Sequence, residues 1–82
     1  MKITSLDLRR QYESIRDEIN RAVLEVIDSQ SFILGPFVES FERSIAKFCY
    51  AKHAIGVSSG TDAILLALMA CGIKNGDEVI TT

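Results

Sequence analysis

Metal-binding and redox signatures are missing from this 82-residue sequence, which has two cysteines, one histidine, one proline and no tryptophan. Cys49 and Cys71 lack the C-x-x-C spacing of zinc and redox sites, so we predict no metal site and expect both thiols to be buried as small apolar side chains. The nine Lys and Arg residues form no basic run and are outnumbered by eleven Asp and Glu. This balance argues against nucleic acid as a partner, because few cations are available to neutralise its phosphates.

A long apolar segment is also missing. No apolar run follows Lys2 at the amino terminus, so we find no secretory signal peptide there. The longest strongly apolar run, residues 63–71, is far shorter than the roughly 20 residues that span a bilayer. We therefore expect no membrane span and a cytoplasmic location. The length allows at most one small domain, and chains of roughly 60 to 80 residues bury too little surface to be robust alone.

Two amphipathic helices are predicted in the first half of the chain. Between Tyr12 and Ser29, apolar residues recur every three or four positions and charged residues fill the other faces, which is the pattern of a helix with one buried stripe. Gly35 and Pro36 then begin a second helix, because proline is tolerated in a first helical turn. The apolar stripes are Ile15, Ile19, Ala22, Val23, Val26 and Ile27 in the first helix, and Val38, Phe41, Ile45 and Phe48 in the second.

The second half of the chain has the pattern of a strand, a helix and a strand. Residues 53–58 form a short apolar run bounded by small polar residues, which favours a buried strand. Residues 63–70 are apolar on every face, as in a helix deep inside a larger body, and Gly72 predicts a left-handed helix end. A turn at residues 74–77 leads to a strand-like segment at residues 78–82. The order helix, helix, strand, helix, strand predicts an α/β protein with a parallel sheet.

Two strands cannot cover a helix that is apolar on every face. We therefore expect the chain to be part of a longer polypeptide. One alternative is a complete small domain that oligomerises to bury the helix. Another is a purely structural helical segment that serves oligomerisation, although the strand-like residues 53–58 and 78–82 count against it.

The strongest local signal for chemistry is the turn that precedes the apolar helix. The amino terminus of a helix offers unpaired N–H groups and the positive end of the helix dipole, Gly60 lets a ligand approach the backbone, and the hydroxyls of Ser59 and Thr61 add donors. These groups suit a phosphate. The alternative is that Ser59 or Thr61 merely caps the helix. No lysine follows the glycine and G-x-G-x-x-G is absent, so neither a P-loop nor a dinucleotide fingerprint is present.

The remaining polar residues favour structural roles. His53 is the only histidine and has no evident partner for acid-base or metal chemistry. Asp62 is explained by the favourable interaction of a carboxylate with the start of a helix. We expect Glu39 and Glu42 to lie on helix faces that meet water, and we find no catalytic pair of carboxylates.

Several motifs along the chain together resemble one family, the DegT/DnrJ/EryC1/StrS sugar aminotransferases. This resemblance implies the aspartate-aminotransferase fold type (fold type I), in which a large domain holds a mostly parallel seven-stranded sheet and the protein is a homodimer. Residues 1–35 would be a leading helix and loop, and residues 36–82 the start of the α/β core. The motifs are Asp7-Leu8, Gln11-Tyr12, Phe32 to Pro36, Val38, Phe41-Glu42, His53 to Val57, Ser58 to Ala63, Leu65, Ala67-Leu68 and Gly72 to Thr82.

The resemblance also implies a cofactor and a reaction. It places Gly60 and Thr61 where a backbone amide and a hydroxyl hold the phosphate of pyridoxal 5'-phosphate, with Ser59 as a weaker candidate. The family passes an amino group from glutamate, through this cofactor, to a keto group of a nucleotide-linked sugar. Its catalytic lysine normally lies far downstream of the glycine-threonine turn, so we assign no catalytic residue here and expect the 82-residue chain alone to be inactive. The lysines present, none of which matches the family's lysine motif, are Lys2, Lys47, Lys52 and Lys74.

Two other functions remain open at this stage. A relative of the same family performs sugar dehydration with a histidine in place of the lysine, and the residue that decides between the two lies outside this sequence. A non-catalytic module that binds phosphate or a protein partner is the other alternative.

Overall fold

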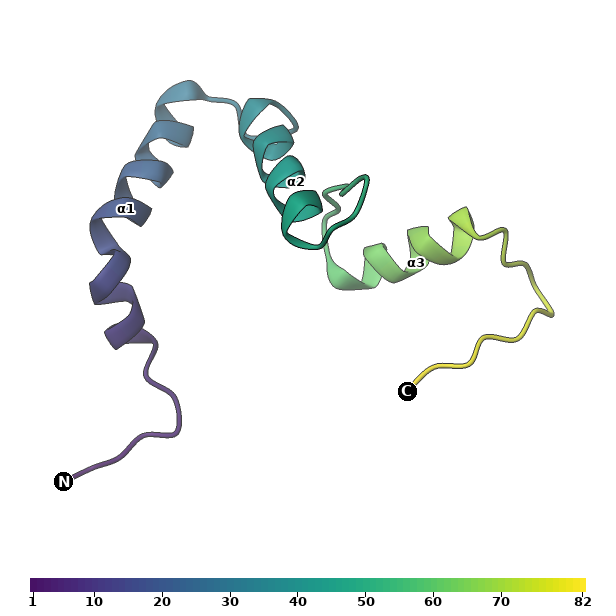
Figure 1. Ribbon diagram of the computed structural model, residues 1–82, viewed down its shortest axis with the longest axis horizontal. Helices are drawn as coiled ribbons and strands as arrows, with labels where there is room; N and C mark the ends of the chain where they lie inside the picture. Colours follow the sequence, from purple (N-terminus) through teal and green to yellow (C-terminus); the bar gives the residue numbers. More distant parts are fainter.

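The computed structural model describes all 82 residues, as three α-helices joined by irregular segments (Figure 1). The helices are α1 (Leu8–Ser29), α2 (Pro36–Phe48) and α3 (Gly60–Ala70). Figure 1 shows them following one another along an open path, with the two chain termini well apart. No helix is sufficiently long and apolar to cross a membrane.

Helix α1 begins before the predicted start at Tyr12 because a polar residue caps it. The side chain of Asp7 accepts a hydrogen bond from the backbone N–H of Arg10 at 3.2 Å, which satisfies one of the free donors of the first turn. The helix ends at Ser29, and the next residue, Gln30, has a left-handed backbone (φ 56°) and donates its N–H to the carbonyl of Ile27. The amphipathic pattern was therefore a correct guide to the helix, and the cap sets its first residue.

Helix α2 is present at the predicted position, with Pro36 in its first turn. Its carboxyl end is a Schellman motif, in which Tyr50 takes the left-handed conformation (φ 53°) that glycine usually provides. The N–H of Tyr50 donates to the carbonyl of Lys47 at 3.2 Å, and the N–H of Ala51 donates to the carbonyl of Ala46 at 2.9 Å. These two bonds satisfy carbonyls of the last helical turn and redirect the chain into the segment that precedes α3.

Helix α3 contains the predicted apolar residues and begins earlier than expected, because Gly60, Thr61 and Asp62 form its first turn. Its end confirms the predicted role of Gly72, which has a φ of 74°. The N–H of Gly72 donates to the carbonyl of Met69 at 3.0 Å, and the N–H of Ile73 donates to the carbonyl of Leu68 at 3.1 Å. These two bonds form a second Schellman motif.

The two predicted strands do not form, so the α/β arrangement of strand, helix and strand is wrong for this structure. Residues 53–58 and 78–82 have no regular secondary structure, and none of their backbone groups bonds to the other segment. A strand exists only through a ladder of hydrogen bonds to a neighbouring strand, whereas a helix satisfies its own backbone. Residues 53–58 have the apolar pattern of a buried strand, but no neighbouring strand pairs with them.

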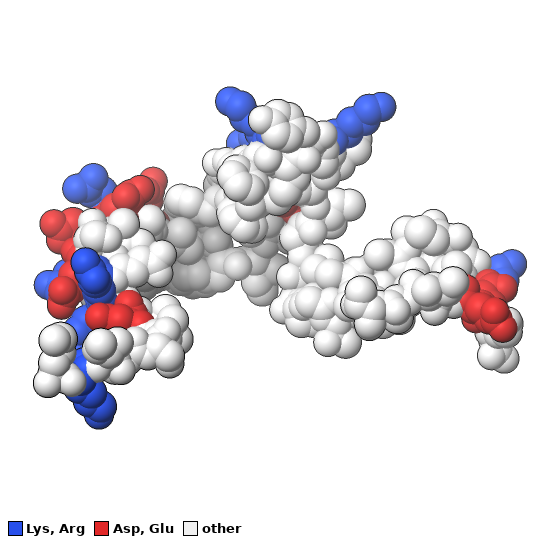
Figure 2. Space-filling model, turned by 60° about the horizontal axis from the view of Figure 1, so that its bottom comes forward, with Lys and Arg blue, Asp and Glu red and all other residues white.

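The helices leave their apolar residues exposed. No residue is buried, and the accessible surface of 8204 Å² compares with about 4,900 Å² for a compact protein of this mass. The radius of gyration is 18.2 Å, against about 12 Å for a compact domain of this length. Cys49 and Cys71 are exposed, so the prediction that they are buried is wrong, because no core forms around them. On the face shown in Figure 2, the right-hand arm of the molecule carries charged side chains only at its far end.

This openness predicts how the 82-residue chain melts. Because no side chain is buried, unfolding exposes little additional apolar surface, and we expect a gradual loss of helical ellipticity at 222 nm without a calorimetric peak. A compact domain of this length would absorb about 60 kcal/mol on unfolding. A sharp transition with an enthalpy near that value would contradict the open arrangement.

Candidate functional site

The candidate site is the turn at the amino terminus of α3, and Ser59 caps that helix. The hydroxyl oxygen of Ser59 accepts a hydrogen bond from the backbone N–H of Asp62 at 3.1 Å. Its carbonyl accepts the N–H of Ala63 at 3.0 Å. The capping role that the sequence suggested for Ser59 or Thr61 therefore belongs to Ser59.

Gly60 and Thr61 present two donors that the chain itself does not use. Their N–H groups lie in the first turn, so the carbonyls that would accept them inside a helix do not exist, and neither donates in any cap or turn. Both residues are exposed, and a Cβ added at Gly60 would meet nothing within 4 Å. The turn thus leaves two aligned N–H groups open to a ligand at the positive end of an 11-residue helix.

Asp62 closes the turn and is oriented by a second hydroxyl. The hydroxyl of Ser58 donates to the carboxylate of Asp62, which is half-buried in the first turn of α3. Two side-chain bonds therefore link residues 58 and 59 to Asp62, one through its carboxylate and one through its N–H. These bonds agree with a structural role for Asp62 and hold the turn in one shape.

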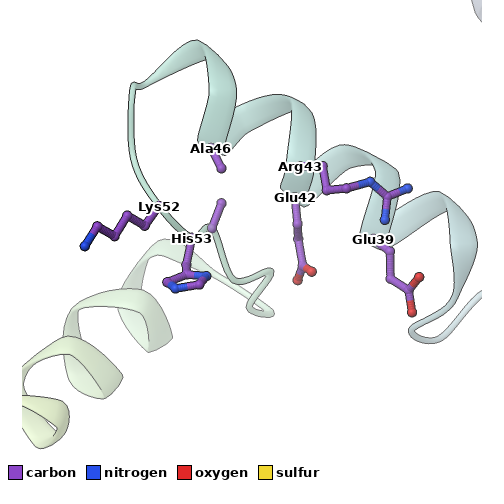
Figure 3. Close-up of a pocket in the computed structure, with 7 residues that line it drawn as sticks. Glu39, Glu42, Arg43, Ala46, Lys52 and His53 are labelled. Carbon is purple, nitrogen blue, oxygen red and sulfur yellow. The ribbon is translucent and has the colours of Figure 1, made fainter.

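One further contact holds the segment that leads into the turn, and sequence reasoning missed it. The backbone N–H of Gly56 donates to the Oε1 atom of Glu42 in α2 at 2.7 Å. Glu42 was expected to face water, but it is half-buried and points from α2 towards this segment (Figure 3). A signal was present in the sequence, since Glu42 shares one face of α2 with Val38 and Ala46 at spacings of four residues.

His53 lies beside a polar cavity of about 210 Å³ between α2 and the segment after it (Figure 3). Its ring is exposed, and no group of three or more His, Cys, Asp or Glu side chains is arranged to hold a metal ion. The cavity therefore mixes acidic and basic groups without a defined ligand set. Its lining residues are Glu39, Glu42, Arg43, Ala46, Lys52, His53 and Ala54.

An apolar groove lies on the other side of the same segment. Ile55 and Val57 line a cavity of about 420 Å³ together with residues of α3 that include Leu66 and Ala67. The groove is lined by apolar residues only. The segment before the turn is thus flanked by α2 through Glu42 and by α3 through apolar side chains.

Comparison with known proteins identifies the class to which this chain belongs. The model of the DegT/DnrJ/EryC1/StrS aminotransferase family matches residues 13–82, which is most of the chain. The chain therefore belongs to the DegT/DnrJ/EryC1/StrS aminotransferase family. No solved structure matches it.

Individual relatives agree with this assignment. The chain is 50% identical over its whole length to a pleiotropic regulatory protein of Geobacillus stearothermophilus, of which it covers 22%. Over 96% of its length it is 47% identical to a dTDP-3-amino-3,4,6-trideoxy-alpha-D-glucose transaminase of Streptomyces venezuelae, of which it covers 21%. Over 95% of its length it is 42% identical to a UDP-N-acetyl-3-dehydro-alpha-D-glucosamine 3-aminotransferase of Acidithiobacillus ferrooxidans, again covering 21%. The chain spans about a fifth of the length of these relatives.

The cap geometry predicts the effect of replacing Ser59. Ser59→Ala removes the acceptor for the N–H of Asp62, at a cost of about 1 kcal/mol to a helix that is short enough to be marginal. We expect the 13Cα shifts of α3 in the 82-residue chain to move towards random-coil values, while those of α1 and α2 stay unchanged. Ser59→Asn should preserve the shifts because its side-chain oxygen also accepts.

Ser44→Ala is the matched control for this change. Ser44 lies within α2 and its hydroxyl donates to the carbonyl of Ser40, so its loss uncovers no helix end. If Ser59→Ala leaves the shifts of α3 as unaffected as Ser44→Ala does, Ser59 is not the cap.

Proposed function

We propose that this chain is the cofactor-phosphate part of a pyridoxal-phosphate-dependent aminotransferase that moves an amino group from glutamate to a keto group of a nucleotide-linked sugar. The observation that carries the proposal is the family match over residues 13–82. The names of two relatives, which describe transaminases of dTDP-linked and UDP-linked sugars, support the class of acceptor.

The geometry before α3 fits a phosphate group. The free N–H groups of Gly60 and Thr61 supply two donors at the positive end of a helix, and Thr61, which carries a hydroxyl, is exposed. The open space at Gly60 lets a phosphate oxygen approach the backbone. Ser59 is a weaker candidate because its oxygen already accepts from Asp62, although its hydroxyl hydrogen is free to donate.

In this function the chain binds and orients, and the cofactor carries the chemistry. Pyridoxal phosphate supplies an electron sink that lets an amino group pass between two carbonyl carbons. Gly60 and Thr61 would hold its phosphate, and the hydrogen bonds of residues 58 and 59 to Asp62 would keep that anchor rigid. A homodimeric assembly and a cytoplasmic location are further parts of the proposal that rest on the family and on the sequence.

The phosphate assignment predicts the effect of removing the Thr61 hydroxyl. In the full-length protein that contains this chain, Thr61→Val keeps the shape of the side chain but leaves a phosphate oxygen unpaired, at a cost of about 1 to 3 kcal/mol. We expect the Kd of the apoprotein for pyridoxal phosphate to rise by about five- to 150-fold in an absorbance titration. Thr4→Val, outside the three helices, is the matched control and should leave the Kd unchanged. An unaltered Kd in Thr61→Val would remove Thr61 from the site.

The 82-residue chain alone should not catalyse transamination. None of its four lysines matches the family's catalytic lysine motif, so the chain offers no residue for the covalent step. We expect no amino transfer from glutamate to a keto-sugar nucleotide when the chain is assayed with added pyridoxal phosphate, while the full-length protein turns over under the same conditions. Turnover by the short chain above the rate of free cofactor would contradict this.

A further inference from the structure

We propose that Glu42 is a positioning residue for the phosphate turn, acting through the backbone of Gly56. The inference rests on the proposed role of Gly60 and Thr61 and adds a residue to it from a different helix. Glu42 bonds to the backbone before the turn and not to the turn itself. Its carboxylate fixes the segment whose end places the two free N–H groups.

The segment before the turn has almost no other hydrogen bonds. Among residues 52–57, the bond from the Gly56 N–H to the Oε1 atom of Glu42, at 2.7 Å, is the only one formed. Gly60 lies only four positions after Gly56, so a shift of the segment is carried directly into the turn. A hydrogen bond to a carboxylate is shorter and stronger than one between neutral groups, which suits a single point of attachment.

Gly56 leaves room for this close approach. A Cβ at residue 56 would lie 3.2 Å from Oε1 of Glu42 and 3.6 Å from Cγ1 of Val38. The first distance is tighter than ordinary van der Waals contact, so any larger residue would push the carboxylate away or move the segment. The glycine and the carboxylate therefore form a matched pair, although they are 14 residues apart in the chain.

The segment lies between α2 and α3. Val38, Glu42 and Ala46 lie on one face of α2 and are half-buried, as is Ala54 of the segment. On the other side, Ile55 and Val57 line the apolar groove against α3. The hydrophobic effect is non-directional and would leave the segment free to slide along the groove, whereas the bond to Glu42 specifies one position.

The test compares pyridoxal phosphate with pyridoxal, which lacks the phosphate, in the full-length apoprotein. We expect Glu42→Ala to raise the Kd for pyridoxal phosphate about tenfold and to leave the Kd for pyridoxal within a factor of about two. Glu42→Gln retains an acceptor oxygen and should restore the affinity to within about threefold of the unmodified protein. A merely structural role would weaken both ligands together, because a damaged fold does not distinguish them.

Two further variants keep the proposal testable. Glu42→Asp shortens the side chain by one methylene group and should weaken pyridoxal phosphate selectively even if Glu42→Ala does not fold. Glu39→Ala, one turn earlier on α2 and without a side-chain hydrogen bond, is the matched control and should change neither Kd. An equal loss of both ligands in Glu42→Asp, or a loss in Glu42→Gln as large as that in Glu42→Ala, would overturn the proposal.

The same titration separates this proposal from the function on which it rests. If Thr61→Val weakens pyridoxal phosphate while Glu42→Ala and Glu42→Asp do not, Glu42 has no positioning role and the phosphate site stands. If neither Thr61→Val nor any Glu42 variant weakens pyridoxal phosphate selectively, the phosphate site itself is wrong and the role of Glu42 falls with it.

Discussion

The need of each helix to satisfy its own end groups governs this structure. Because no element buries another, the free N–H and carbonyl groups at each helix end find partners either within a few residues or in the surrounding water. Asp7 and Ser59 accept donors at two amino termini, while Tyr50 and Gly72 take left-handed conformations that redirect the chain at two carboxyl termini. Even the turn after α3 closes locally, since the N–H of Lys74 donates to Asp77 at 2.7 Å.

This constraint explains how much of the fold could be predicted from the sequence. Helices and their ends depend on neighbours within four residues, so the periodic pattern before Ser29, Pro36 at the second helix and Gly72 at the third were sufficient guides. The predicted strands at residues 53–58 and 78–82, like the predicted burial of the cysteines, required partners elsewhere in space. An apolar pattern indicates that a segment can be buried. Burial also requires a partner surface, which the pattern itself does not provide.

The same distinction between local and long-range interactions applies to the candidate site. The residues of the turn were found from the sequence because a hydroxyl, a glycine and a hydroxyl before an apolar helix are adjacent. Whether such groups cap a helix or bind an anion could not be decided from spacing, since the same orphan N–H groups serve both purposes. The structure gives the capping role to Ser59 and leaves Gly60 and Thr61 unused. Glu42 was missed because its partner is 14 residues away and is a backbone N–H, which no side-chain motif reveals.

Different hydrogen bonds determine the shape of the turn before α3 and its position relative to α2. Its shape comes from Ser58 and Ser59, which bond to Asp62 within one helical turn and move with α3. Its place relative to α2 comes from a different interaction, the bond of Glu42 to Gly56. Local bonds can preserve two aligned N–H groups even when α3 shifts as a body, but they cannot decide where those groups point. Under the proposed function, the orientation of a bound phosphate depends on the contact between Glu42 of α2 and the segment of residues 52–57. That orientation is then more sensitive to long-range changes than the helix cap is.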